Sequence, residues 1–207
     1  MQTNAPWPQS QGKRLLDFFA AMLLLLILWP VMILIAIVLY FQDGFPILFQ
    51  QIRPGRREEL FTLIKFRTLA DTPSETETPA GKIPPTPFCK FLRASGLDEL
   101  PELWNILKGD MSFVGPRPLL VRYLPRYSLH QQRRHHVRPG LTGLAQVNGR
   151  NAIDWPQRLD LDVEYVETAT LGTDLHILWN TILLIGRGEG TAEPGEFMGN
   201  PLEDRQK

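Results

Sequence analysis

The chain has 207 residues, of which 22 are basic and 22 acidic, so its formal net charge is zero. This length suits one domain with an appendage, and the balance excludes a protein that is basic or acidic throughout. Hydrophobic residues make up 43% of the chain, and one N-terminal run holds many of them, which argues against a wholly soluble protein and against a multi-span transporter. The single cysteine, Cys89, excludes an intrachain disulfide and fits a reducing compartment.

Residues 18–41 form a run of 24 without a charged or polar side chain. As one helix this run would measure roughly 36 Å, enough to cross a hydrocarbon core of about 30 Å. Pro30 lies in its middle and removes a backbone hydrogen bond there. Both flanks are basic, which assigns both ends to the cytoplasm; the basic residues are Lys13, Arg14, Arg53, Arg56 and Arg57. A kinked spanning helix and a re-entrant helix broken near Pro30 both remain open.

The rest of the chain predicts short helices and one hairpin. The hairpin covers 45–69, with a turn at Arg53-Pro54-Gly55-Arg56, and a flexible loop follows over 71–87. Helical spacing and stop signals predict helices over 88–94, from 97 to a stop at Gly109, over 119–134 with a break at Pro125, over 160–167 and over 175–185. The segments 114–118 and 138–143 are predicted as loops, and the tail after 186 as flexible.

The zero net charge hides a strongly segregated pattern. Residues 47–150 carry 16 basic and 9 acidic side chains, whereas residues 151–207 carry 4 basic and 11 acidic ones. Within 111–150 there are seven arginines, three histidines and no carboxylate. Such a stretch is either a solvated basic face or a surface for phosphates or anionic headgroups, and forty residues without a balancing acid favour the anionic ligand.

Two short motifs in the basic region could carry chemistry. Asp98 and Glu99 are expected in the first turn of a helix that also contains Pro101, where the free N–H groups favour an ionised carboxylate that could serve as nucleophile or Mg²⁺ ligand. Simple helix capping explains the same pair, although the cations around it favour a functional site; these are Lys90, Arg93 and Lys108. In Gly115-Pro116-Arg117-Pro118 two prolines fix the backbone around a guanidinium suited to phosphate, and a structural turn facing solvent is the alternative.

The segment 92–120 reads LRASGLDELPELWNILKGDMSFVGPRPLL, and it resembles the bacterial sugar transferase family, in particular the small monotopic phosphoglycosyl transferases. The resemblance covers nearly the whole chain. Its other parts are Lys13-Arg14-x-x-Asp17, Arg53-Pro54-Gly55, Lys65-Phe66-Arg67-Thr68, the segment VRPGLTGLAQVNGRN over 137–151, and Asp174. The length corresponds to the minimal catalytic form of the family, without the additional spanning helices of larger relatives.

This resemblance implies transfer of a sugar phosphate from a UDP-sugar to polyprenyl (undecaprenyl) phosphate, with release of UMP, as the first membrane step of glycoconjugate and polysaccharide biosynthesis. Asp98 would be the nucleophile, would carry the phosphosugar covalently and would contact Mg²⁺, and Glu99 would act as base or position the metal. Arg117 would hold phosphate. The other substrate-binding and phosphate-binding residues implied are Lys65, Arg93, Pro116, Pro118, Gln146, Asn148, Arg150 and Asp174.

The fold class implied is mainly α with a small β-hairpin, in a monotopic membrane protein. Residues 1–46 would form a re-entrant membrane helix broken at Pro30, with Lys13, Arg14 and Asp17 at the headgroup boundary. Trp29 stands where the family often has serine, so a hydroxyl that could satisfy freed carbonyls is missing.

Residues 47–207 would form the catalytic domain on the cytoplasmic face of the bacterial inner membrane. Its partners would be the UDP-sugar, polyprenyl phosphate, the lipid bilayer and downstream glycosyltransferases, with no nucleic acid. Two alternatives to this reaction remain open. One is a non-catalytic scaffold that binds anionic lipids, and the other is a membrane glycosyltransferase that releases UDP.

Overall fold

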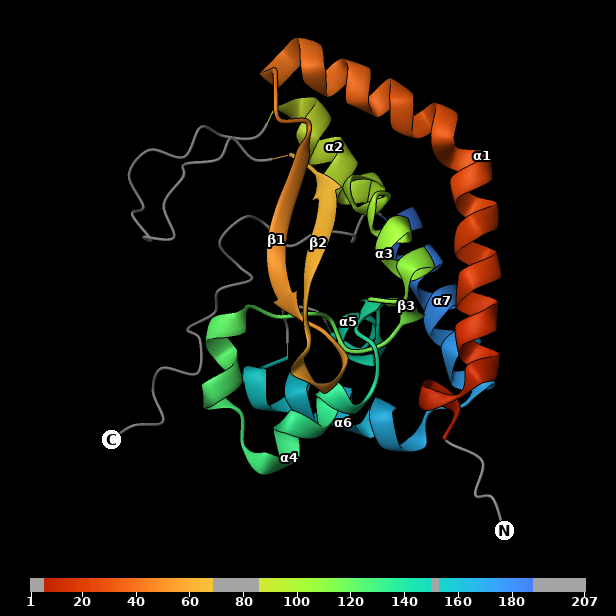
Figure 1. Ribbon diagram of the computed structural model, residues 1–207, viewed down its shortest axis with the longest axis vertical. Coiled ribbons are helices and arrows are strands. Elements are labelled where there is room, and N and C mark those ends of the chain that lie inside the picture. Colours follow the sequence, from red (N-terminus) through yellow and green to blue (C-terminus); the bar gives the residue numbers. More distant parts are fainter. Residues whose placement is uncertain (1–5, 69–85, 150–152, 188–207) are drawn as a thin grey trace.

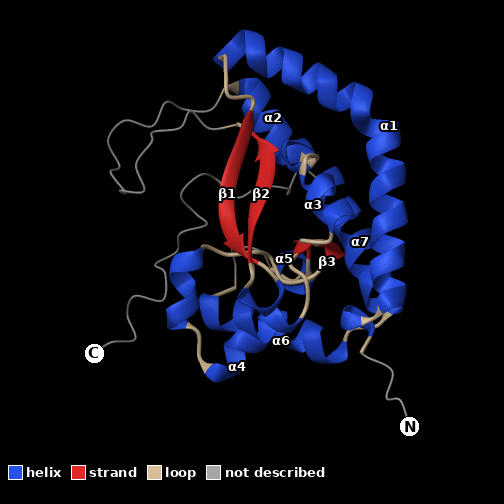
Figure 2. Ribbon diagram, viewed as in Figure 1, coloured by secondary structure: helices blue, strands red, loops and turns tan. Residues whose placement is uncertain are grey.

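The structure is a computed structural model that describes residues 6–68, 86–149 and 153–187 (Figure 1). Helices dominate, beside one prominent hairpin (Figure 2), which confirms the predicted class of a mainly α protein with a small β-hairpin. The helices are α1 (Gln11–Asp43), α2 (Pro87–Ser95), α3 (Glu102–Lys108), α4 (Leu129–Gln132), α5 (Leu144–Val147), α6 (Trp155–Thr168) and α7 (Leu171–Gly186). The predictions of a flexible loop over 71–87 and of a flexible tail after 186 fall almost entirely outside the described residues.

Helix α1 is a single apolar helix of 33 residues whose most apolar 18-residue window has a mean hydropathy of 3.1. By length and composition it could cross a membrane. Ser10 caps its start by accepting a hydrogen bond from the Lys13 amide, and Gly44, at φ 65°, ends it. Only 11% of that window is buried within the protein, so most of this apolar surface has no protein partner.

Pro30 bends α1 without interrupting it. The backbone is helical from Gln11 to Asp43, with Pro30 inside, and Figure 1 shows the helix turning sharply between two nearly straight arms. Proline lacks the N–H that would bond the carbonyl four residues back and its ring crowds that carbonyl, which accounts for a bend. The predicted break near Pro30 is therefore a bend in a continuous helix.

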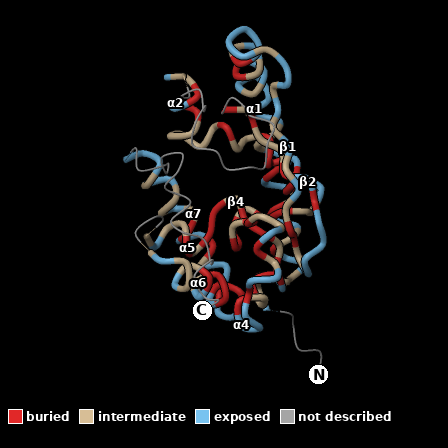
Figure 3. Tube along the Cα trace, turned by 90° about the vertical axis from the view of Figure 1, so that its left-hand side faces the viewer, coloured by how far each residue is buried: buried red, intermediate tan, exposed pale blue. Residues whose placement is uncertain are grey.

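The two arms of α1 pack on different parts of the domain. In the first arm, Ala21 is fully buried in a cluster with Phe61 and Ile106. In the second arm, Ile35 and Leu39 pack against the hairpin and α2. The bend thus lets one narrow stripe of a single helix cover two faces of the domain, while the rest of α1 stays exposed (Figure 3).

The start of α1 is fastened by charged side chains. Arg14 donates to the carbonyls of Ile106 and Leu107 at 2.6 and 2.8 Å, at the end of α3, where a cation complements the helix dipole. The buried Lys13 Nζ lies 2.6 Å from Asp174 Oδ2. Like Lys13, Asp17 is buried, and its carboxylate accepts a hydrogen bond from the Phe113 amide at 3.3 Å. These residues anchor α1 to the domain, and their expected place at the headgroup boundary remains a prediction.

The predicted hairpin is present. β1 (Leu48–Pro54) and β2 (Leu60–Phe66) pair antiparallel, with Leu48 opposite Phe66. A 3₁₀ turn, η2 (Arg56–Glu58), connects them. Asn105 of α3 is fully buried and clasps β2, accepting from the Ile64 amide and donating to the Thr62 carbonyl. This clasp fixes the hairpin against the segment that follows α2.

The predicted helix from 97 to Gly109 forms in two pieces. α2 ends at Gly96, whose left-handed φ of 70° turns the chain into a single 3₁₀ turn, η3 (Leu97–Glu99). α3 begins only at Glu102, after Pro101, and ends at Gly109, as predicted. Asp98 and Glu99 therefore lie in a first helical turn, as expected, but this is the separate 3₁₀ turn η3 and not the first turn of α3. Proline favours the start of a helix and has no backbone N–H to donate to a carbonyl of the preceding turn, so α3 starts beyond Pro101.

A second, two-stranded sheet was not predicted: β4 (Gly140–Thr142) lies inside the predicted loop over 138–143, whereas the predicted loop over 114–118 is present from Gly115 onward, directly after β3 (Ser112–Val114). β3 and β4 pair in parallel, with Ser112 opposite Gly140. Gly115 directly follows β3 and lies against the backbone of the segment around Arg138. A Cβ at position 115 would lie 2.5 Å from the Arg138 carbonyl oxygen. The short strands escaped prediction because their neighbours are glycine and proline, which usually signal loops.

The C-terminal half is helical with shifted boundaries. The predicted helix over 119–134 is divided into η4 (Val121–Arg126), α4 and η5 (Arg133–His136), and the division falls at Ser128, which caps α4, rather than at Pro125. Both α6 and α7 begin earlier than predicted, at Trp155 after the N-cap Asp154 and at Leu171 after the N-cap Thr170. α7 keeps one side exposed (Figure 3); its exposed apolar side chains are Leu171, Leu175, Trp179, Ile182, Leu183 and Ile185.

Candidate active site

Asp98 lies on the turn η3, between α2 and α3 and beside the hairpin. Only 6% of the residue is exposed. Because α3 has seven residues and begins after Pro101, its N-terminus does not account for an ionised carboxylate at position 98. The surrounding side chains have to supply that stabilisation.

One negative and three positive side chains influence the ionisation of Asp98. Burial, followed by the charge of Glu99, raises the pKa of Asp98 to about 6. The positive charges of Lys65, Arg117 and Arg93 oppose this rise. At neutral pH the carboxylate is therefore mostly ionised, poorly hydrated and faced by cations, as expected of a nucleophile directed at a phosphate.

Glu99 is joined to Arg117. Arg117 Nη2 donates to Glu99 Oε1 at 2.5 Å. Burial alone would raise the pKa of Glu99, but the charge and hydrogen bond of Arg117, with smaller contributions from Lys65 and Arg93, bring it below its usual range. A carboxylate with a lowered pKa is a weak base, so this geometry suits an orienting role for Glu99 better than proton abstraction.

Lys65 and Arg93 approach from separate elements. Lys65 is the penultimate residue of β2, and its ammonium lies 5.4 Å from the Phe49 ring centroid. Arg93 lies in the last turn of α2, and its buried Nη1 has no hydrogen-bond partner within the described residues. An unpartnered buried guanidinium nitrogen beside a carboxylate offers a donor to an anionic ligand.

The structure adds two charged residues that were not predicted as members of the site. Glu102 is 3% exposed, and burial, with the charges of Glu99 and Asp98, raises the pKa of Glu102 to about 8. Arg53, on β1, donates through Nη1 to the Pro118 carbonyl at 3.2 Å. Burial and the charge of Arg117 lower the pKa of Arg53 to about 10, so it stays cationic at neutral pH. The three-residue spacing from Glu99 to Glu102 was the available sequence signal.

The Pro116–Pro118 loop is held at three consecutive carbonyls. The Pro116 carbonyl accepts from the Gly140 amide at 3.0 Å, and the Arg117 carbonyl accepts from Arg134 Nη2 at 2.7 Å. Arg53 holds the Pro118 carbonyl. The alternative of an Arg117 that simply faces solvent is excluded, because its side chain is bound to Glu99 and the loop that carries it is held by three other elements.

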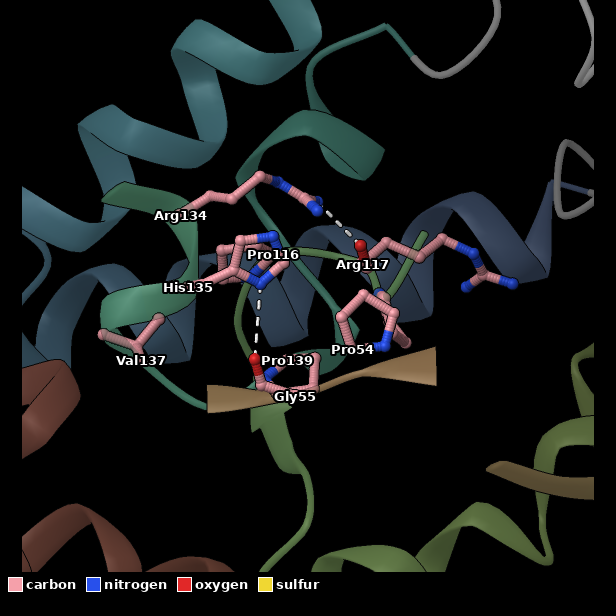
Figure 4. A pocket seen from close by; sticks show the side chains of 9 residues that line it. Pro54, Gly55, Pro116, Arg117, Arg134, His135, Val137 and Pro139 are labelled. Carbon is pink, nitrogen blue, oxygen red and sulfur yellow. Dashed lines mark hydrogen bonds between the residues drawn. The ribbon is translucent and has the colours of Figure 1, made fainter. Parts of the chain in front are cut away.

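A small cavity of about 10 Å³, room for about one water molecule, lies behind this loop. Figure 4 shows the Arg117 guanidinium directed away from the cavity, while Arg134 reaches the Arg117 carbonyl and His135 faces Gly55. Burial and the charge of Arg134 lower the pKa of His135 to about 4, so its ring is neutral at pH 7. The lining residues are Pro54, Gly55, Pro116, Arg117, Pro118, Arg134, His135, Val137 and Pro139.

Among the described residues, no hydrogen bond or ion pair joins Gln146, Asn148 or Asp174, which the resemblance also implies, to this cluster. Gln146 lies on α5, and both polar atoms of its side chain are buried without a partner in the described chain. Asn148 is exposed and donates to the Leu144 carbonyl, and Arg150 lies outside the described residues. The Asp174 carboxylate accepts hydrogen bonds from Trp7, Lys13 and Tyr165. Asp174 is thus occupied by protein donors, which favours an anchoring role over phosphate binding.

The described residues contain no cluster of three or more His, Cys, Asp or Glu side chains arranged to hold a metal ion. Mg²⁺ in phosphate-transfer sites is commonly held by one or two carboxylates together with substrate phosphates. Asp98 fits that pattern, since it is ionised at neutral pH and adjoins cations suited to a diphosphate. The donor set does not fit a cage made of protein ligands alone.

A family model described as bacterial sugar transferase matches residues 8–188. The match covers both arms of α1, the hairpin, the Asp98 turn and α7. The chain therefore belongs to the bacterial sugar transferase family, which confirms the resemblance seen in its motifs.

Named relatives agree with this family. The chain is 44% identical over 182 residues to the uncharacterized sugar transferase EpsL of Bacillus subtilis, covering 86% of this chain and 89% of EpsL. It is 38% identical over 181 residues to the UDP-glucose:undecaprenyl-phosphate glucose-1-phosphate transferase of Caulobacter vibrioides, covering 82% of this chain and 68% of that protein. It is 35% identical over 196 residues to the undecaprenyl-phosphate galactose phosphotransferase of Salmonella typhimurium, covering 86% of this chain but 41% of that longer protein.

Proposed function

We propose that this chain transfers a sugar phosphate from a UDP-sugar to polyprenyl phosphate and releases UMP. The observation that carries the proposal is the buried Asp98 carboxylate, ionised at neutral pH among Lys65, Arg93 and Arg117. The names of two relatives, which describe sugar-1-phosphate or sugar-phosphate transfer to undecaprenyl phosphate, support this reaction class.

The reaction proceeds in two displacements at one phosphorus atom. An oxygen of Asp98 attacks the phosphorus that carries the sugar, the bond to the bridging oxygen breaks, and UMP leaves with that electron pair. A phosphate oxygen of the polyprenyl phosphate then attacks the same phosphorus. The carboxylate of Asp98 is released unchanged, and the lipid-linked diphosphosugar is the product.

The cations around Asp98 oppose the charge that builds up in each displacement. Arg117 presents a planar pair of donors to the diphosphate, Glu99 orients it, and Lys65 and Arg93 flank it. Fixed donors in a partly dehydrated site stabilise a phosphoryl transition state more than solvated ones do. The ion pair between Glu99 and Arg117 supports this assignment over the role of Glu99 as general base.

Mg²⁺ belongs to this proposal as a metal held by Asp98 and the substrate phosphates. When bound, it would neutralise part of the diphosphate charge and so permit a carboxylate to approach. Glu102, whose pKa lies above neutral, would stay protonated and would add no third charge to the pair Asp98 and Glu99.

The exposed apolar surface supports a membrane location. Each large apolar side chain left in water forgoes about 1.5–3 kcal/mol of burial, and α1 and α7 expose many of them. Lipid removes that cost. A re-entrant α1, bent at Pro30 with both ends on the cytoplasmic side, agrees with the basic flanks and with the sharp bend (Figure 1). The reaction then takes place at the cytoplasmic face of the inner membrane, as the first membrane step before downstream glycosyltransferases.

The nucleotide product distinguishes this proposal from its rivals. Purified protein in detergent is mixed with Mg²⁺, undecaprenyl phosphate and a panel of UDP-sugars, and UMP and UDP are quantified separately. UMP release that needs the lipid for repeated turnover and disappears in Asp98→Asn supports the proposal. UDP as the product indicates a glycosyltransferase, and no product with any sugar, together with binding to anionic vesicles, indicates a scaffold.

A further inference from the structure

We propose that Arg134 and Asp162 form a positioning pair that aims Arg117 at the reacting phosphate by holding its backbone carbonyl. Neither residue belongs to the motifs singled out in the sequence. The inference rests on the proposed function for its kinetic readout, but it also makes a structural prediction that needs no substrate.

The pair is deeply buried and geometrically specific. Arg134 donates to Asp162 Oδ2 through Nε at 3.1 Å and through Nη2 at 2.7 Å. The side chains are 2% and 4% exposed. Arg134 also lies over the Tyr127 ring, 5.6 Å from its centroid. Two donors on one oxygen, with a ring beneath, leave the guanidinium little freedom to move.

Nη2 of Arg134 also donates a hydrogen bond to the Pro116–Pro118 loop. Besides Asp162 it bonds the Arg117 carbonyl at 2.7 Å (Figure 4). Pro116 and Pro118 already restrict the backbone on both sides, so a fixed carbonyl at Arg117 also fixes the direction in which its side chain leaves the chain. That side chain reaches Glu99 at the site. A continuous series of short contacts thus joins α6 to the carboxylate pair.

Lysine at position 134 could not do the same. An ammonium is a single point, whereas the guanidinium spans Asp162 and the Arg117 carbonyl with nitrogens held in one plane. A displacement of about 1 Å at a phosphate-binding group lowers turnover by about 10²-fold. Arg134→Lys should therefore lower activity even when the protein stays folded.

A matched control lies one residue away. Arg133 forms an ion pair with Glu167, so it joins the same two elements, η5 and α6, as the buried pair does. Its side chain is 44% exposed and its partner 38%. Arg133→Lys alters an ion pair between these elements without touching the Arg117 loop.

The kinetic test is a double-mutant cycle on kcat/KM for UMP release, with Arg134→Lys measured in the wild type and in Arg117→Lys. We expect a loss of about 10- to 10²-fold in the wild type and less than about threefold in Arg117→Lys, since an effect exerted through Arg117 disappears when Arg117 is already impaired. Equal losses in both backgrounds, which general destabilisation would give, overturn the proposal. Arg133→Lys should match the wild type.

Hydrogen exchange supplies the second readout and uses the protein without substrate. In Asp162→Asn, which keeps the shape but not the charge, the peptide covering residues 112–119 should exchange faster than in the wild type, whereas Arg133→Lys should leave it unchanged. Unchanged exchange in Asp162→Asn overturns the proposal whether or not the enzyme is active. A wild type that releases no UMP overturns the proposed function instead, and the exchange result then decides the positioning role alone. If Arg134→Lys fails to fold, Asp162→Asn serves in the cycle.

Discussion

Arg117 and Glu99 lie 18 residues apart in the chain, yet Arg117 Nη2 is 2.5 Å from Glu99 Oε1, directly beside Asp98. This contact ties the Pro116–Pro118 loop to the turn η3. It lowers the pKa of Glu99 against the effect of burial, whereas burial and Glu99 together raise the pKa of Asp98. The pKa values of these two adjacent carboxylates are therefore shifted in opposite directions. This difference suits one of them to act as nucleophile and the other to orient Arg117.

Arg117→Lys should lower kcat/KM by about 10²-fold although the positive charge is kept. The proline-flanked backbone fixes where the side chain starts, and a single ammonium replaces the planar fork that meets Glu99. The measurement is steady-state UMP release at several UDP-sugar concentrations. The control is Arg133→Lys, whose side chain is exposed and paired with Glu167. A rate near that of the wild type in Arg117→Lys would mean that charge alone matters at this position.

The pH dependence of kcat/KM should have an acidic limb near pH 6. Asp98 has to be ionised to attack, and burial followed by the charge of Glu99 raises its pKa to about 6. Activity is therefore present above pH 6 and falls about tenfold per pH unit below it, whereas an ordinary aspartate would place the limb near pH 4.

Glu99→Gln tests the cause of this shift. It removes the negative charge that raises the pKa of Asp98 and breaks the ion pair that offsets the charge of Arg117, which lowers that pKa. Both changes act in the same direction, so the acidic limb of the variant should move to lower pH. A limb that stays in place, or moves upward, would show that Glu99 does not influence the ionisation that limits the rate.

Local signals in the sequence were sufficient for the elements that local residues determine. Alternating apolar residues around Arg53-Pro54-Gly55 specify the hairpin, and Gly109 ends α3 because a left-handed residue, at φ 99°, is needed there. The long apolar run forms α1. These signals do not predict the direction in which α1 bends or the two parts of the domain against which it packs, because both depend on partners far away in the chain.

Only some of the site residues could be predicted from the sequence. Motif resemblance pointed to Asp98, Glu99 and Arg117, but the helix-terminus argument for Asp98 was wrong because Pro101 delays the start of α3. Glu102 and Arg53 were not predicted as site residues, although Arg53 belongs to the turn motif, because each enters the site through tertiary packing. The resemblance implied substrate binding for Asp174, whereas its hydrogen-bond partners within the protein favour an internal anchor.

Both ends of α1 should face the cytoplasm. In a Cys89→Ser background, single cysteines replace Gln11, the first residue of α1, and Gln50, which follows α1 in β1; both positions are exposed. The cells are treated with a membrane-impermeant maleimide while intact and again after permeabilisation. Both should react only after permeabilisation, as should a cysteine at the exposed Gln157 of α6. Labelling of one end from outside, with the other protected, would establish a spanning helix instead.

The phosphosugar should be carried by Asp98 and not by Glu99. Asp98 is buried and mostly ionised at neutral pH under the influence of three cations, whereas Glu99 is paired with Arg117 at 2.5 Å. A covalent intermediate predicts ping-pong kinetics. Enzyme, Mg²⁺ and UDP-sugar without lipid acceptor should therefore release at most about one UMP per enzyme, apart from slow hydrolysis.

Peptide mass spectrometry locates the adduct. A sugar phosphate should be found on Asp98 after the reaction without lipid, should disappear when undecaprenyl phosphate is added, and should be absent in Asp98→Asn. Glu99→Gln is the matched variant: it keeps the nucleophile and loses the orienting partner of Arg117, so the adduct should still form, only more slowly. No UMP before lipid addition, and no adduct, would establish direct transfer in a ternary complex. An adduct on Glu99 would keep the two-step chemistry but would require Arg117 to release that carboxylate before each turnover, and the ion pair would then be a resting state that the substrate has to open.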